Sequence, residues 1–85
     1  MSTFATALRA LPDGTFRGRA HGRSYIVTKT RPGDGRITKL VAEELGGSDY
    51  VSLNHFELAS GSILKPCEMP AKKVTAFVLD LTPDP

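Results

Sequence analysis

Between residues 14 and 66 the chain is cut into short segments by turn signals, and within most segments apolar residues recur at every second position. The turn signals are "HG" at 21–22, "RPGDGR" at 31–36, "GGSD" at 46–49 and "ASGS" at 59–62. Connections this short join antiparallel neighbours, because parallel neighbours need a long crossover. The pattern predicts an antiparallel meander of four to five strands.

One of the predicted strands is ambiguous. The others cover residues 14–20, 23–31, 50–58 and the short segment "ILKP" at 63–66. In residues 36–45, "RITKLVAEEL", the apolar residues also fit a helix that Gly46 would close. We favour a strand there, because the turn signals on both sides bracket a strand-sized segment.

Both ends of the chain have helical spacing instead. A short N-terminal helix is predicted by one apolar stripe, Phe4, Ala7, Leu8 and Leu11. A longer C-terminal helix, with Pro70 suited to its first position, is predicted by Ala71, Val74, Phe77, Val78 and Leu81. The predicted fold is α+β, with both helices packed on one face of the mainly antiparallel sheet. The 85 residues are expected to form a single domain, 1–85, with a frayed tail at 82–85.

Composition limits the function classes. The longest apolar runs are a few residues, far short of the roughly 20 that span a bilayer. Arg9 interrupts the apolar N-terminus, so export is not expected. Cys67 is the only cysteine, which excludes an internal disulfide and favours a reducing cytoplasm. His21 and His55 are far apart in sequence, so we expect no metal ion and no cofactor.

Charge is divided unevenly along the chain. Residues 1–42 contain eight Lys and Arg against two acids, a net charge of +6. Residues 43–85 contain three against seven, a net charge of −4. Such a division indicates either an anionic partner for the first half or two halves that neutralise each other within the fold.

The segment "TFRGRAHGRSYIVTKTR" at 15–31 is rich in arginine and contains no acid. With Tyr25 exposed beside the cations, it would form a basic sheet face, because neighbouring strands lie only about 4.8 Å apart. The predicted ligand-binding residues are Arg17, Arg19, Arg23, Tyr25, Lys29, Arg31 and Arg36. Arginines that alternate with apolar residues are also typical of the solvated side of any sheet, so the segment alone does not identify a binding surface.

Three functions remain open. The leading one is a non-enzymatic binding or protein-interaction module that uses the basic sheet face, including self-association between oppositely charged halves. The alternative is single-stranded nucleic-acid binding, in which Arg17, Arg19 and Arg23 follow the phosphates and Tyr25 stacks on a base. The third is a thiol-dependent activity.

The third function depends on Cys67, which precedes the predicted C-terminal helix. A nucleophilic thiol needs a base, and the fold would have to bring His55 or His21 close to it. A lone cysteine in a small domain is more often a small buried apolar residue. The adjacent acids Glu43 and Glu44 point to opposite faces of a strand and cannot act together. We therefore expect a protein that is not an enzyme.

Two longer segments, "KLVAEELGGSDYVSLNHFEL" at 39–58 and "LKPCEMPAKKVTAFV" at 64–78, resemble a family of short uncharacterised bacterial proteins. The resemblance implies a bacterial cytoplasmic protein. It implies no activity and no functional residues.

Overall fold

The computed structural model describes residues 3–33 and 35–85, so Asp34 in the predicted "RPGDGR" turn lies outside the described residues. The fold is α+β, as predicted. Along the chain its elements are α1 (Thr3–Ala10), β1 (Gly14–Ala20), β2 (Arg23–Thr30), β3 (Ile37–Glu44), β4 (Tyr50–Leu58), β5 (Gly61–Pro66), α2 (Ala71–Asp80) and β6 (Thr82–Pro83).

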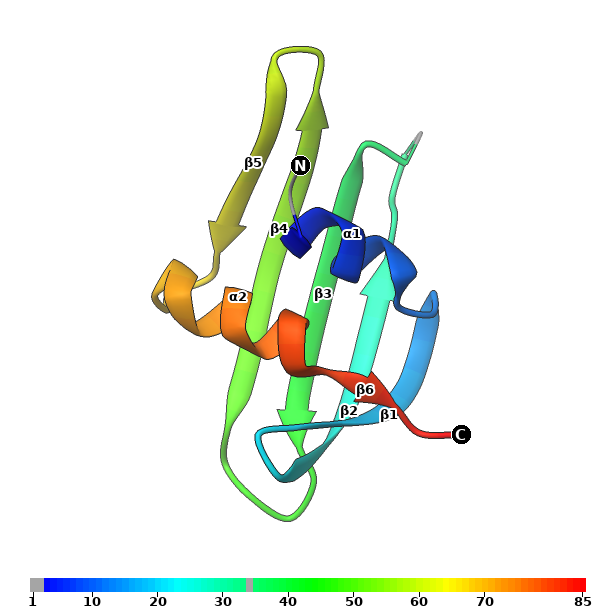
Figure 1. Ribbon diagram of the computed structural model, residues 1–85, viewed down its shortest axis with the longest axis vertical. Helices are drawn as coiled ribbons and strands as arrows, with labels where there is room; N and C mark the ends of the chain where they lie inside the picture. The colour runs from blue at the N-terminus through cyan, green and yellow to red at the C-terminus, as the bar shows by residue number, and fades with distance from the viewer. Residues whose placement is uncertain (1–2, 34) are drawn as a thin grey trace.

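All strands of the described chain form one antiparallel sheet in the order β5-β4-β3-β2-β1-β6 (Figure 1). The first five strands follow chain order, which confirms the predicted meander. The ambiguous segment 36–45 is a strand, because β3 pairs with β2 on one side and with β4 on the other. The first hairpin turns at His21 (φ 52°) and Gly22 (φ 76°), directly between the paired residues Ala20 and Arg23.

The sheet has six strands rather than the predicted four to five, because β6, within the predicted tail at 82–85, adds a strand beside β1. Thr82 pairs with Arg19 and Pro83 with Gly18. The absence of a side chain at Gly18 permits this approach, since an added Cβ would lie 2.9 Å from Leu81 Cδ1 and 3.1 Å from the Thr82 carbonyl oxygen. A strand of two residues has no periodicity that the sequence could reveal.

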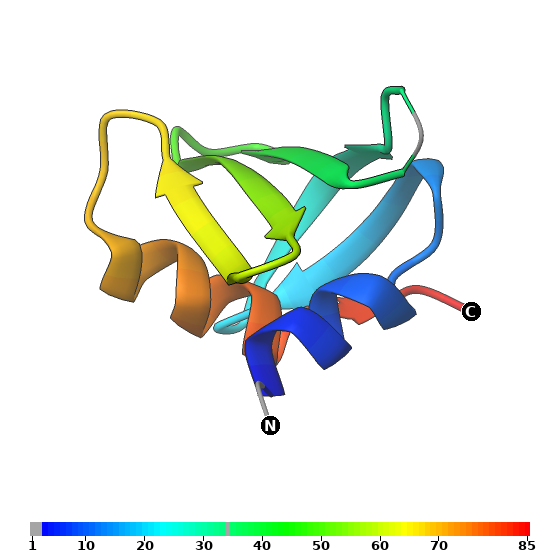
Figure 2. The ribbon, with the colours of Figure 1, turned by 90° about the horizontal axis from the view of Figure 1, so that it is seen from above.

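Both helices lie on the same side of the sheet, as predicted (Figure 2). We call the sheet side toward the helices the core face and the other side the open face. Successive side chains of each strand point to the core face and the open face in turn. Val27, Leu40 and Leu53 point to the core face and are buried. The buried cluster comprises Leu8, Leu11, Ala20, Tyr25, Val27, Leu40, Ala42, Val51, Leu53, Val74, Phe77, Val78 and Leu81.

A buried lysine joins α1 to the sheet. Lys29 lies on the core face of β2, and its side chain is only 2% exposed. Its Nζ donates hydrogen bonds to the carbonyl oxygens of Leu8 at 2.8 Å, Leu11 at 2.7 Å and Arg9 at 3.2 Å. These carbonyls lie at the C-terminal end of α1, where the helix itself supplies no donors. Burial lowers the pKa of Lys29, while Asp13, 3.7 Å away, opposes that effect.

We expect Lys29→Met to destabilise the protein by about 2–4 kcal/mol, because it keeps the apolar stem but leaves three carbonyls without their donor. Chemical denaturation followed by circular dichroism measures the loss. Lys39→Met is the matched control, because Lys39 is exposed on the neighbouring strand and its loss should change the free energy of unfolding by less than about 0.5 kcal/mol. Equal effects of the two substitutions would contradict a capping role for Lys29.

Candidate functional site

The predicted basic residues do not gather on one face of the sheet. Phe16 pairs with Val27 and Arg17 with Ile26, so Arg17 and Arg19 lie on the open face. Four other residues of the predicted set lie on the opposite, core side of β2 or of its extension: Arg23, Tyr25, Lys29 and Arg31. Arg36 is exposed in the turn before β3. Strand pairing alone brings cations near one another, but side-chain alternation separates them.

The expectation of an exposed Tyr25 was wrong, because its side chain belongs to the core and the residue is 1% exposed. Its ring packs edge-on against Phe77, with the centroids 4.8 Å apart. Its hydroxyl donates a hydrogen bond to Asp49 Oδ2 at 2.6 Å. An aromatic ring with a polar tip is buried readily when a partner meets that tip. Tyr25 therefore offers no surface for stacking on a base.

Ion pairs account for part of the charge division along the chain. Among the described residues, three of them join the basic half to the acidic half: Arg9 to Glu57 at 3.2 Å, Arg23 to Glu44 at 4.0 Å and His21 to Asp80 at 3.5 Å. The last of these is ionic only when the imidazole is protonated. Arg31 pairs within its own half, with Asp13 at 2.7 Å. Internal neutralisation, one of the two readings of the charge pattern, thus occurs in this fold.

On the open face, cations and apolar residues lie in neighbouring rows across the strands. Lys39, Asn54 and Lys65 form one row. Beside it lies an apolar row of Ile37, Phe56 and Ile63. On the other side of the Lys39 row, one row of residue pairs intervenes. Beyond that row, Ile26 lies in a row with Arg17, Glu43 and Tyr50. Within the described residues no ion pair is found for Arg17, Arg19, Lys39 or Lys65.

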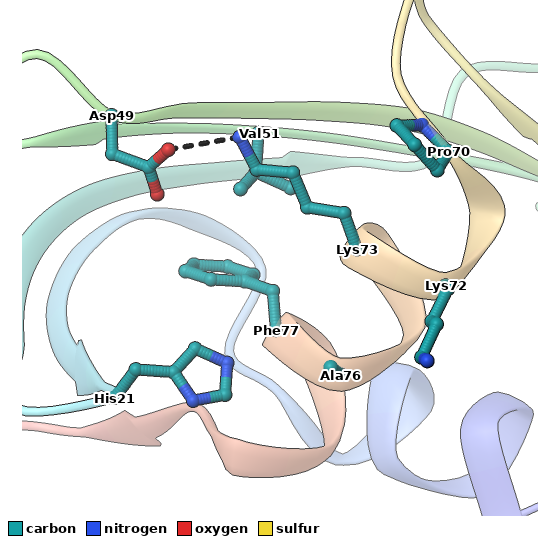
Figure 3. A pocket seen from close by; sticks show the side chains of 8 residues that line it. All are labelled: His21, Asp49, Val51, Pro70, Lys72, Lys73, Ala76 and Phe77. Atoms are coloured by element: carbon teal, nitrogen blue, oxygen red, sulfur yellow. Dashed lines mark hydrogen bonds and ion pairs between the residues drawn. The ribbon is translucent and has the colours of Figure 1, made fainter.

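A separate cavity of about 400 Å³ lies on the helix side, where α2 meets the start of β4 and the β1–β2 turn (Figure 3). We call it the α2 cleft. It is lined by His21, Asp49, Val51, Pro70, Lys72, Lys73, Ala76 and Phe77. Its volume is within the range of small-molecule sites, about 300–1,000 Å³.

Asp49 organises the wall of the α2 cleft. Its Oδ1 lies 2.9 Å from Lys73 Nζ, and its Oδ2 accepts the hydrogen bond from Tyr25. The Lys73 hydrogen bond, followed by that of Tyr25, lowers the pKa of Asp49. Burial, reinforced by Asp49, raises the pKa of Tyr25 to about 12. The sequence marked Asp49 only as a turn residue, and no local pattern connects positions 25, 49 and 73.

The structure separates Cys67 from both histidines. Asn54 Nδ2 approaches Cys67 Sγ at 3.8 Å from the open-face side of β4. His55 is 3% exposed on the core face, and its ring lies 5.8 Å from that of Phe4. Burial lowers the pKa of His55, which favours the neutral ring. His21 lies in the first hairpin beside Asp80. Neither histidine is arranged to act as a base for the thiol.

The described residues contain neither a metal-binding cluster nor a helix suited to span a membrane. In residues 3–33 and 35–85 no group of three or more His, Cys, Asp and Glu is placed to hold a metal ion. No helix in that part of the chain has the length and apolar character needed to cross a membrane. Comparisons with family models, curated proteins and solved structures find no match to this chain.

We expect Tyr25 to ionise near pH 12, about two pH units above an ordinary tyrosine. Because the folded pKa exceeds the unfolded one, this contribution to stability is complete below pH 10 and is lost as the pH rises toward 12. Ultraviolet titration of the Tyr50→Phe variant measures Tyr25 alone, since the chain has two tyrosines. Ionisation near pH 10 in the folded protein would contradict the buried Tyr25–Asp49 contact.

Proposed function

We propose that this chain is a non-enzymatic protein-binding module whose working surface is the open face of the sheet. The observation that carries the proposal is the combination, on that face, of exposed apolar residues and cations that have no ion pair among the described residues. Tyr50 is 44% exposed and Ile63 is 42% exposed. The apolar side chains supply area for burial against a partner, and the cations in the same or nearby rows, Arg17, Arg19, Lys39 and Lys65, place positive charge among them.

The chemistry of the open face favours a partner that presents both apolar residues and acids. A second copy of the chain fits poorly, because two open faces placed together would bring their cations into contact. Glu43 is the one acid among the rows described above, so it offsets only part of that charge. Interfacial cations mainly accelerate association and select the partner, while the apolar rows supply affinity.

The β4–β5 hairpin extends the same surface. It projects beyond the neighbouring strands in Figure 1. Leu58, paired with Gly61 at its end, is 47% exposed, and Ile63 follows on the returning strand. β5 is also an edge strand, with one side not paired within the sheet. Apolar side chains on a projecting edge are costly to leave in water, which is consistent with a covered surface in the working protein.

Nucleic acid is the competing occupant. The predicted nucleic-acid site depended on Tyr25, which is buried, and on Arg23, which lies on the other side of the sheet. The open face still carries Tyr50 and the partly buried ring of Phe56. Most of its apolar residues are aliphatic, however, and aliphatic side chains do not provide the stacking platform that single strands use. A protein partner therefore fits the surface better.

Photo-crosslinking tests the proposal. A photoreactive residue at Ile63 should yield a discrete protein adduct in a native cell extract, whereas one at Leu79, which is 51% exposed on α2, should not. Adding Lys39→Glu and Lys65→Glu should reduce the Ile63 adduct at least about tenfold, since both reversals oppose an acidic partner. Lys72→Glu on α2 is the matched charge control and should leave the adduct unchanged.

Three outcomes would contradict the proposal. Equal adducts from Ile63 and Leu79 would indicate nonspecific contact. An adduct removed by nuclease would identify nucleic acid instead. An adduct with a second copy of this chain, together with a dimer in sedimentation experiments, would replace the acidic partner by self-association.

A further inference from the structure

The α2 cleft lies on the opposite side of the sheet from the open face, so it is independent of the proposed protein interface. Its floor is apolar: Val51 is fully buried on β4, and Phe77 is 2% exposed on α2. Pro70 and Ala76 extend the apolar lining along the helix. Apolar lining of this kind favours a ligand with an apolar body.

One end of the α2 cleft is closed by the first hairpin. The main-chain nitrogen of His21 donates a hydrogen bond to Asp80 Oδ2 at 2.6 Å, and the imidazole Nδ1 lies 3.5 Å from the same oxygen. His21 has φ 52°, in the left-handed region that residues other than glycine seldom adopt. The hairpin is thus attached to the last residue of α2, which fixes this wall of the cleft.

Charges around the α2 cleft are not equivalent. Lys73 is paired with Asp49, and Asp49 also accepts the Tyr25 hydroxyl, so the negative charge of Asp49 is offset within the wall. Lys72 lines the same cavity and has no ion pair among the described residues. In the view of Figure 3, the Asp49–Lys73 pair lies above the ring of Phe77, while Lys72 and His21 lie on either side of Ala76. The lining therefore keeps an excess of positive charge at Lys72.

We propose that the α2 cleft binds a small organic anion, whose apolar part contacts Pro70, Ala76 and the exposed edge of Phe77 and whose acidic group contacts Lys72. The apolar floor excludes a small inorganic anion as the preferred ligand, because such an ion would leave the floor in water. The positive charge at Lys72 disfavours a cation of the same shape. The ligand class is thus an aromatic or aliphatic carboxylate, sulfonate or phosphate ester.

A matched pair of fluorescent probes tests this assignment. Anilinonaphthalene sulfonate carries an apolar ring system with one negative charge, and phenylnaphthylamine has similar rings without the charge. We expect both to bind the folded protein, the sulfonate more tightly. Lys72→Ala should weaken the sulfonate by about fivefold and leave the neutral probe unchanged. Lys65→Ala, a lysine deletion on the open face, should change neither probe.

A second substitution tests the location. Ala76→Glu adds negative charge inside the cleft at an exposed helical position and should weaken the sulfonate at least about tenfold. Leu79→Glu adds the same charge to α2 at a residue that does not line the cleft, and should have little effect. Circular dichroism confirms that each variant remains folded, and amide shifts map the bound probe.

The proposal is overturned if Ala76→Glu and Leu79→Glu act alike, if both probes respond equally to Lys72→Ala, or if the probes shift amides of the open face rather than those of α2 and His21. None of these readouts depends on a protein partner bound to the open face. Failure at the α2 cleft would therefore leave the protein-binding proposal untouched, and failure of the crosslinking experiment would leave the cleft proposal untouched.

Discussion

Two short helices have to cover the core face of a much wider sheet, and the long polar side chains on β2 complete that cover. Lys29 extends under α1 and donates hydrogen bonds to its last carbonyls, while Tyr25 lies against α2 and reaches Asp49. Each side chain buries an apolar stem or ring and delivers a polar tip to a partner. In the described residues no buried side-chain nitrogen or oxygen lacks a hydrogen-bond partner. Both helices are thus connected to one strand by satisfied polar groups as well as by apolar packing.

This use of β2 determines what remains for the open face. Because Lys29 and Tyr25 belong to the core, the open-face cations without an ion pair among the described residues come from strands distributed across the sheet, such as Arg17 on β1, Lys39 on β3 and Lys65 on β5. They lie in rows beside and among apolar residues instead of forming a continuous basic stripe. That mixture of cations and apolar side chains suits a protein interface better than it suits a track for a phosphate backbone.

The sequence predicted elements more reliably than surfaces. Alternation, turn signals and helical stripes located α1, α2 and the five strands of the meander, because each depends on neighbouring residues. It missed β6, whose pairing depends on the missing side chain of the distant Gly18. The sequence also placed Tyr25 and Lys29 on an exposed binding surface, although both are buried. A polar tip is buried only where a hydrogen-bond partner meets it, and these partners, Asp49 and the carbonyls of α1, are far away in sequence. The α2 cleft depends on the same long-range contacts.

The open face and the α2 cleft are separated by the thickness of one strand. Tyr50 and Val51 are consecutive on β4, yet Tyr50 is exposed on the open face and Val51 lines the α2 cleft. Their side chains share no surface, but their backbone is common, and Asp49 immediately precedes both. Asp49 is held by Tyr25 from β2 and by Lys73 from α2. The Asp49 contacts therefore fix the position of this end of β4 from the helix side. Because the backbone is shared, they also order the open face at this end of the strand.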